Sequence, residues 1–156
     1  MTDQQLKSAI LDASRRAEVI GAVDCLYEKV QHEIDARRPV CVVSGRCCRF
    51  EEYGHRLYVT TIELASFLAK LDRVADPSWN GQGCPFQQNK LCTVHAIRPF
   101  GCRMFFCDAT STDWQNKMYE HFHAELKRLH EEHDVPYAYI EWRRALSILG
   151  VVDAAL

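Results

Sequence analysis

Apolar side chains recur every three or four positions from residue 3 to residue 37, which is the spacing of one face of a helix. Thr2 or Asp3 can cap the start of this segment, and Pro39 stops it. One straight helix of this length would run ~52 Å, whereas a compact domain of this size has a radius of gyration near ~15 Å. We therefore expect a break within the segment, and Gly21 is the expected position.

A second amphipathic helix is predicted after a short strand at residues 57–59. Thr60 and Glu63 have the spacing of a capping box, in which each side chain satisfies the backbone N–H of the other residue. The apolar positions that follow repeat at helical spacing, and residues 72–83 form a polar loop. The predicted core-facing stripe consists of Ile62, Leu64, Phe67, Leu68 and Leu71.

The C-terminal third of the chain predicts two more helices. Thr112 and Gln115 form a second capping-box pair, which opens a helix that reaches about His133. A break follows, and Pro136 stands near the first position of a last helix that ends before Gly150. The apolar stripe of the longer helix is Trp114, Met118, Phe122, Leu126 and Leu129. Its histidines are expected to be exposed: His121, His123, His130 and His133.

The middle of the chain lacks a sustained period. Residues 41–58 are expected to be irregular, Asn89 and Lys90 to form a turn, and residues 93–98 to form a helical turn or two ended by Pro99. These patterns predict a mostly α fold, with helices around an irregular cysteine-rich metal-binding middle segment. We expect a single domain over 1–156, with an N-terminal helical region (1–39), a cysteine-cluster region (40–110) and a C-terminal helical pair (111–150).

Composition narrows the class of protein. Of the 156 residues, 47% are hydrophobic and 26% are charged, as in an ordinary globular chain. The net charge of −2 gives no pull toward nucleic acid or an anionic membrane, and no apolar run approaches the ~18 residues of a membrane span. The polar N-terminus lacks the apolar segment of a secretion signal, so we expect a cytoplasmic protein without membrane or nucleic-acid partners. The sequence leaves a protein partner open.

Eight cysteines give the chain its most specific chemistry. They fit either four disulfides in an exported scaffold or reduced metal ligands, and a third alternative is a set of unrelated buried thiols. The lack of an export signal and the long helical segments favour reduced ligands. Soft thiolates at this density indicate zinc, an iron–sulfur cluster or copper(I).

Cys25 lies within the first helical segment, far from the other cysteines, and is expected to be a buried apolar residue outside any metal centre. The remaining seven form an upstream group of three and a block of four whose members are separated by seven, nine and four residues. All seven are candidate metal ligands. They are Cys41, Cys47 and Cys48, followed by Cys84, Cys92, Cys102 and Cys107.

The spacing of these cysteines favours an iron–sulfur cluster over zinc. Structural zinc sites usually take ligands in pairs two to four residues apart, and this chain has no C-x-x-C pair. Adjacent Cys47 and Cys48 are expected to point to opposite sides of an extended segment, so that only one of them faces the centre. Dispersed ligands suit a cubane, which favours [4Fe–4S]. The preferred ligands are Cys84, Cys92 and Cys102 with one of the adjacent pair, followed by Cys41 and Cys107.

Basic side chains flank the cysteines. Arg46, Arg98 and Arg103 stand beside a cysteine or close to one. A neighbouring cation stabilises a thiolate and offsets the negative charge of a four-thiolate centre. We expect these three arginines to contact the cofactor, and a solvated surface is the alternative.

The ordered segments CVVSGRCCRF, VTTIE, CPF, LCTVHAIRP and RPFGCRMFFC span roughly residues 41–107. Together they resemble the YkgJ family of cysteine-cluster proteins, which is named for a C-x-x-C-x-x-C-C motif and described as zinc- or iron-chelating. Flagellin lysine methylases look similar in carrying a related block, which is associated with an iron–sulfur cluster. The chain departs from the family pattern at Ser44, where the family has its second cysteine, and at His95, where it has tyrosine. The His95 imidazole is therefore a candidate replacement ligand.

The resemblance implies a class of cofactor and leaves the reaction undefined. We expect a metal-binding protein that holds an iron–sulfur cluster in an accessory, electron-transfer or metal-handling role. The alternatives are a structural zinc-binding interaction module and an enzyme whose cluster sits near a substrate pocket. The chain has no nucleotide-binding glycine loop, nucleophile triad or dinucleotide fingerprint, so the sequence does not decide whether it is an enzyme.

Overall fold

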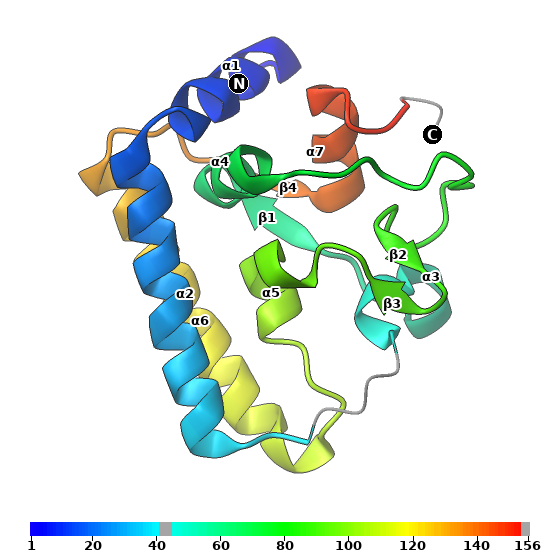
Figure 1. Ribbon diagram of the computed structural model, residues 1–156. Helices are drawn as coiled ribbons and strands as arrows, with labels where there is room; N and C mark the ends of the chain where they lie inside the picture. The colour runs from blue at the N-terminus through cyan, green and yellow to red at the C-terminus, as the bar shows by residue number, and fades with distance from the viewer. Residues whose placement is uncertain (41–44, 154–156) are drawn as a thin grey trace.

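The structure is a computed structural model that describes residues 1–40 and 45–153. Most of these residues lie in helices, which confirms the predicted mostly α class (Figure 1). Two small sheets join β1 to β4 and β2 to β3. The helices are α1 (Asp3–Ser14), α2 (Ala17–Arg37), α3 (Phe50–Tyr53), α4 (Thr61–Lys70), α5 (Phe100–Arg103), α6 (Thr112–Glu132) and α7 (Trp142–Leu149). The strands are β1 (Tyr58–Thr60), β2 (Gln87–Gln88), β3 (Leu91–Cys92) and β4 (Tyr139–Glu141).

The first helical segment breaks at Arg15 and Arg16, so the prediction of a break at Gly21 is wrong. Thr2 begins α1 with a capping box, because its hydroxyl accepts from the Gln5 N–H at 3.1 Å and the Gln5 side chain accepts from the Thr2 N–H at 2.8 Å. Arg16 is extended, which lets α1 pack onto α4 while α2 runs beside α6 (Figure 1). Gly21 lies inside α2, where an added Cβ would meet no atom within 4 Å.

Helix α4 is the central element of the fold, and the predicted capping box at its start is confirmed. Residues 61–67 of this helix are all buried. Two apolar clusters meet on α4, since Leu64 and Phe67 enter one of them and Ile62 enters the other. The last two residues of the predicted stripe are partly buried against the first cluster.

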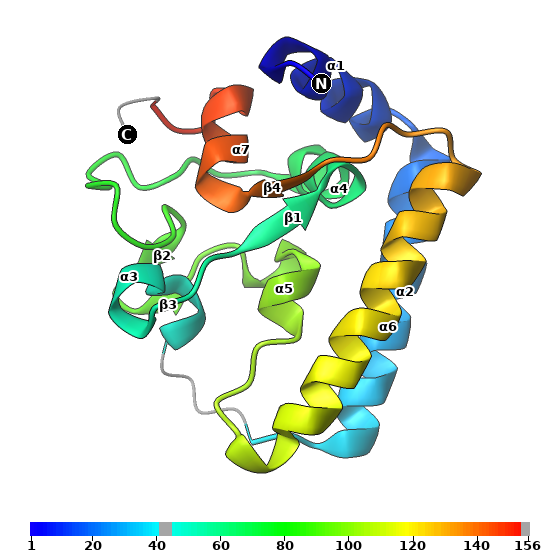
Figure 2. The ribbon, with the colours of Figure 1, turned by 180° about the vertical axis from the view of Figure 1, so that it is seen from behind.

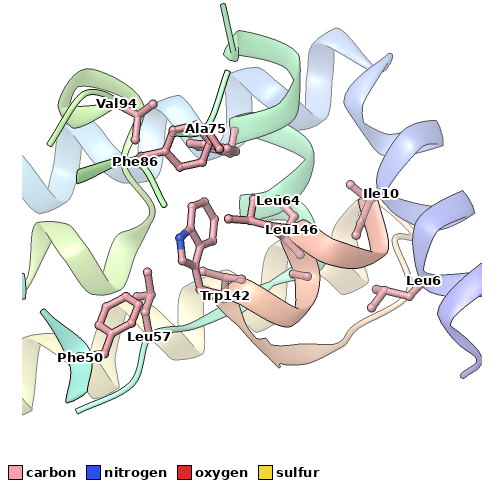
Figure 3. Close-up of a cluster of buried hydrophobic side chains, with 13 residues drawn as sticks. Leu6, Ile10, Phe50, Leu57, Leu64, Ala75, Phe86, Val94, Trp142 and Leu146 are labelled. Carbon is pink, nitrogen blue, oxygen red and sulfur yellow. The ribbon is translucent and has the colours of Figure 1, made fainter. Parts of the chain in front are cut away.

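Trp142 stands in the middle of the first apolar cluster, where it is 1% exposed. Figure 3 shows its indole between Phe86 on one side and Phe50 on the other, with Leu64 beyond the edge opposite the ring nitrogen. Phe67 packs edge-on against the indole, with ring centroids 4.8 Å apart. Apolar residues of the cysteine-rich region therefore belong to the same core as the C-terminal helix.

The last predicted helix begins too early, because residues 139–141 form strand β4. This strand pairs antiparallel with β1 and places Tyr58 opposite Glu141. The Glu141 side chain then accepts from the Arg144 N–H at 3.0 Å and caps α7. Pro136 lies in the loop before β4, so the prediction that it stands near the first position of the last helix is wrong. Pairing with a strand far away in the chain overrides the local helical pattern.

Helix α6 does not use the capping box that the sequence predicts. Ser111 is the N-cap residue, and Thr112 is already the first helical residue. The Gln115 side chain instead accepts from the Phe106 N–H at 3.2 Å, which ties α6 to the segment after α5. The predicted apolar stripe does face the second cluster: Phe122 and Leu126 are buried there, and Trp114, Met118 and Leu129 are partly buried.

His130 is 3% exposed, so the prediction of an exposed side chain is wrong for this histidine. Its Nε2 accepts from the Ile62 N–H at 3.3 Å, and its Nδ1 lies 2.8 Å from the Leu126 carbonyl oxygen. The first turn of a helix leaves backbone N–H groups without helical partners. His130 supplies one such partner to α4.

The predicted turn at Asn89 and Lys90 is confirmed, and it joins β2 to β3 in a two-residue hairpin. Both residues have positive φ, 51° and 64°, as a type I′ turn requires. A short helical turn at His95–Ile97 follows and ends before Pro99, as predicted. Figure 2 shows the hairpin and α3 at one edge of the molecule and the pair α2 and α6 at the other. In the described part of the chain, no helix has the length and apolarity to cross a membrane.

Candidate metal centre

Two segments far apart in the sequence hold most of the candidate ligands: the turn that ends at Cys48 and the hairpin region that begins at Cys84. The Cys84 N–H donates to the Cys48 carbonyl at 2.8 Å. The Gln87 side chain donates to the Gly45 carbonyl at 2.9 Å. Gly45 has a φ of 70°, and a Cβ at this position would clash with the Lys90 carbonyl oxygen. The close approach of the two segments therefore depends on glycine.

Cys47 and Cys48 place their sulfur atoms 4.0 Å apart. The prediction that they point to opposite sides of an extended segment is wrong, because residues 46–48 form a 3₁₀ turn. Successive side chains are about 120° apart in such a turn and about 180° apart in a strand. Both thiols can therefore serve one centre.

The thiol of Cys48 is 4% exposed, its sulfur lies 4.0 Å from that of Cys47, and Cys84 and Cys92 are near enough to influence its pKa. Hydrogen bonding with Cys48 is the largest cause that lowers the pKa of Cys47, to about 6, and of Cys92, to about 7. It also lowers the pKa of Cys84. Interaction with Cys47, then with Cys84 and Cys92, raises the pKa of Cys48, because its one proton offsets the negative charge of neighbouring sulfurs. Cys48 thus lies near three other thiols, one from its own turn (Cys47) and two from the hairpin region (Cys84 and Cys92).

Cys102, on the short helix α5, is a fifth thiol beside this group. Burial raises its pKa well above the usual value, and the charges of Cys84 and Cys47 raise it further. Cys102 was predicted as a preferred ligand, and the structure places it next to the group rather than in hydrogen bonding with Cys48. None of the five thiols is in a disulfide: Cys47, Cys48, Cys84, Cys92 and Cys102.

Of the three remaining cysteines, Cys25 and Cys107 lie among the described residues and Cys41 does not. Cys25 is exposed on α2, so the prediction that it is buried is wrong. Its exclusion from the centre stays a prediction. Cys107 is half-buried in the segment between α5 and α6. Cys41, a further predicted ligand, lies outside the described residues, as does Ser44.

Arg98 is the predicted cofactor-contacting arginine whose charge acts on the thiols of Cys47 and Cys92. Its guanidinium lowers the pKa of both Cys47 and Cys92. The Arg98 Nη1 donates to the His95 carbonyl at 2.7 Å and lies 3.3 Å from the His95 Nδ1. The His95 ring is exposed, and burial of part of the ring together with the charge of Arg98 lowers its pKa. A metal-binding role for His95 stays a prediction.

Arg103 and Arg46, the other two predicted arginines, both lie against aromatic rings, and the charge of Arg103 also interacts with the thiol of Cys102. Arg103 donates to the Arg98 carbonyl at 2.8 Å, and its guanidinium carbon lies 4.0 Å from the centre of the Tyr27 ring. It therefore holds the loop that carries Arg98 against α2. The Arg46 guanidinium lies 5.2 Å from the centre of the Tyr53 ring.

The carboxylate of Glu63 fixes the helix that carries Cys102, a role that the capping-box pattern does not predict. One oxygen accepts from the Thr60 N–H at 2.7 Å and from the Thr60 hydroxyl at 2.8 Å. The other oxygen accepts from the Phe100 N–H at 2.9 Å, at the start of α5. Burial raises the pKa of Glu63, and these hydrogen bonds act in the opposite direction. No local spacing connects Glu63 with Phe100, so sequence alone gives no signal for this contact.

Trp142 belongs to the site as well as to the core, although the sequence indicates only packing. Its indole Nε1 is buried and has no hydrogen-bond partner of normal length among the described residues. The N–H lies near enough to the Cys84 sulfur to lower the pKa of this thiol. A buried N–H without an acceptor destabilises a protein, and a negatively charged sulfur would accept from it.

Within the described residues, no three histidine, cysteine, aspartate or glutamate side chains are arranged to hold a metal ion directly. The thiols of Cys47, Cys84 and Cys92 instead lie close enough to Cys48 to influence its pKa. Thiolates this close repel each other, so a proton or a metal cation has to offset their charge.

Comparison with known proteins found no matching family model, no similar curated protein and no similar solved structure. The resemblance to the YkgJ family therefore stays an expectation that depends on the residues quoted for it. Any function of the chain has to be argued from the site itself.

Proposed function

We propose that this chain is a metal-binding protein in which Cys47, Cys48, Cys84 and Cys92 hold a thiolate-bound centre, with Cys102 beside it. The observation that carries the proposal is that the turn with Cys47 and Cys48 docks on the hairpin region with Cys84 and Cys92, which gathers non-disulfide thiols around the buried Cys48. Cysteine binds metal as the thiolate, and a lowered pKa favours this form. The group thus has the ligand chemistry of a soft metal centre.

A metal cation would remove the electrostatic conflict within the group. The neighbouring sulfurs raise the pKa of Cys48, because a further negative charge beside them is unfavourable. The positive charge of Arg98 offsets part of the negative charge at Cys47 and Cys92. Replacement of the proton by a metal lets all four sulfurs act as ligands.

The favoured occupant is an iron–sulfur cluster of the [4Fe–4S] type, with an accessory, electron-transfer or metal-handling role. Such clusters take cysteine thiolates, and hydrogen bonds to their sulfurs set the reduction potential. The fifth thiol at Cys102 enlarges the sulfur-lined region beyond the four ligands that one zinc ion takes. The buried indole N–H of Trp142 supplies a donor beside Cys84.

Zinc is the second candidate, and one distance favours it. Two thiolates that each lie 2.3 Å from a tetrahedral zinc ion are roughly 3.8 Å apart. The sulfurs of Cys47 and Cys48 are 4.0 Å apart. A zinc centre would make the chain a structural module for interaction with another protein.

Purification without oxygen, followed by analysis of iron, acid-labile sulfide and zinc, tests the proposal. We expect near-stoichiometric cluster and a brown colour in the wild-type protein. Cys48→Ser should lose most of the metal, whereas Cys25→Ser, at an exposed position on α2, should retain it. Circular dichroism of both variants shows whether the helices persist.

The outcomes separate the candidates. A colourless protein with near-stoichiometric zinc and no sulfide would select zinc, because zinc has no redox chemistry. A wild-type protein that contains neither metal, or a Cys48→Ser protein with full metal content, contradicts the proposed centre.

A further inference from the structure

A cavity of about 230 Å³ lies beside the thiol group, and both Cys47 and Cys102 line it. Its other walls come from β1, β4, α6 and the segment after α5. Aromatic rings dominate these walls: Tyr58, Phe105, Tyr119 and Tyr139. The rings of Tyr58 and Tyr139 face each other across the β1–β4 pair, with centroids 5.4 Å apart.

The lining of the cavity carries one guanidinium, that of Arg56, and two thiols of the candidate metal centre, those of Cys47 and Cys102. Among the described residues, no aspartate or glutamate lines it. Arg56 is exposed and forms no ion pair or hydrogen bond within the described residues. A guanidinium binds a carboxylate through two parallel N–H···O bonds. Arg56 therefore offers a carboxylate ligand a partner that no carboxylate of the lining competes for.

Further donors point to the same kind of ligand. The Gln115 side-chain oxygen already accepts from the Phe106 N–H, so its NH₂ group is the part left to donate. The hydroxyls of Tyr119 and Tyr139 lie 2.6 Å apart. One proton is used within this pair, and the other hydroxyl proton is left to donate outward.

We infer that this cavity is a binding site for a small aromatic monocarboxylate, with the carboxylate at Arg56 and the ring among the aromatic side chains. The volume corresponds to roughly eight water molecules at ~30 Å³ each, below the ~300 Å³ at which drug-sized sites begin. A single substituted ring fits this size. The inference goes beyond the proposed metal centre, because Arg56 and the rings need no metal to bind a carboxylate.

His55 connects this cavity with the proposed centre. It lines the cavity, and its Nε2 lies 3.2 Å from the Cys47 carbonyl oxygen. Its ring packs against Phe105, with centroids 5.0 Å apart. A ligand among the aromatic rings therefore touches the same segment that presents Cys47, and the cavity gives small molecules access to this side of the centre.

Ligand-observed NMR titration of the protein purified without oxygen tests the inference. The three probes are benzoate, its neutral counterpart benzamide and the cation benzylamine. We expect saturable benzoate binding at least about tenfold tighter than that of benzamide, because only benzoate makes charge-assisted hydrogen bonds with Arg56. Arg56→Gln should weaken benzoate at least about tenfold and leave benzamide unchanged.

Two further variants locate the site. Tyr139→Phe keeps the ring and removes one hydroxyl, so benzoate should bind a few-fold more weakly. Arg73→Gln changes an exposed arginine outside the cavity and should leave benzoate binding unchanged. Absence of saturable benzoate binding, equal binding of benzoate and benzamide, tighter binding of benzylamine, or unchanged benzoate affinity in Arg56→Gln would each overturn the inference.

Metal analysis of the same samples separates this inference from the proposed function. Benzoate binding in a protein without metal would leave the carboxylate site standing and remove the metal centre. A metal-loaded protein that does not bind benzoate would support the metal centre and overturn the carboxylate site.

Discussion

Replacement of Glu63 by glutamine tests whether this carboxylate holds α4 and α5 together. Glu63 is 3% exposed, and each of its two oxygens accepts from a different backbone N–H, one of Thr60 and one of Phe100. Glutamine keeps the shape but has only one acceptor oxygen. Its NH₂ group must therefore face one of these two N–H groups, and that N–H loses its acceptor.

The size of the effect follows from this arrangement. A buried donor that loses its partner costs about 1–3 kcal/mol. For a domain of about 150 residues, each kcal/mol shifts Tm by roughly 2–4 °C. We therefore expect Glu63→Gln to lower the free energy of unfolding by about 1–3 kcal/mol, and Tm by roughly 2–12 °C.

Urea unfolding followed by far-UV circular dichroism measures this change. Glu28→Gln is the matched control, because Glu28 is exposed on α2 and its substitution should change stability by less than ~0.5 kcal/mol. Both variants are compared with wild-type protein at equal metal content, since bound metal adds to stability. A Glu63→Gln protein as stable as the control would refute the bridging role of this carboxylate.

Three other perturbations have defined outcomes. Trp142→Phe removes the N–H donor beside Cys84 and, in a cluster-loaded protein, should lower the reduction potential of the cluster by roughly 20–65 mV, the one-electron equivalent of a hydrogen bond worth about 0.5–1.5 kcal/mol. Electrochemical titration measures this potential, and an unchanged value contradicts the prediction. Burial raises the pKa of Glu63 above its unfolded value, so the folded state binds more protons between the two values. The stabilisation by protonated Glu63 is therefore present at acid pH and is lost as the pH rises through the folded pKa. Urea unfolding at several pH values should show this fall in the free energy of unfolding for wild type and not for Glu63→Gln. Gly45→Ala puts a Cβ against the Lys90 carbonyl at a φ of 70° and should reduce both Tm and metal content, whereas alanine at Gly21, which meets nothing, should reduce neither.

The features that the sequence predicts correctly are those with a local physical cause. The capping box of Thr60 and Glu63 joins residues three apart, and the turn at Asn89 and Lys90 depends on two neighbouring residues. Helical periodicity likewise gives the mostly α class. Each of these signals is complete within a few residues, so tertiary contacts do not have to be known.

The features that the sequence misses depend on contacts between distant segments. Residues 139–141 become a strand because β1 is available for pairing, and His130 is buried because it bonds with the start of α4. The candidate site has the same limit. Cysteine spacing gives the candidate ligands, but the 3₁₀ turn that brings Cys47 and Cys48 together follows from docking of Gly45 on the hairpin.

Core packing and backbone hydrogen bonds position the segments that carry the thiols. Phe86, two residues after Cys84, is fully buried against Trp142 and Phe67, so apolar packing fixes the chain on which this sulfur is carried. The Cys84 N–H bond to the Cys48 carbonyl then fixes the opposite segment. A site positioned by core packing has little freedom to spread its sulfurs apart, because well-packed interiors resist displacement. The repulsion between the four sulfurs is therefore relieved by protonation, and a bound metal would change their protonation state.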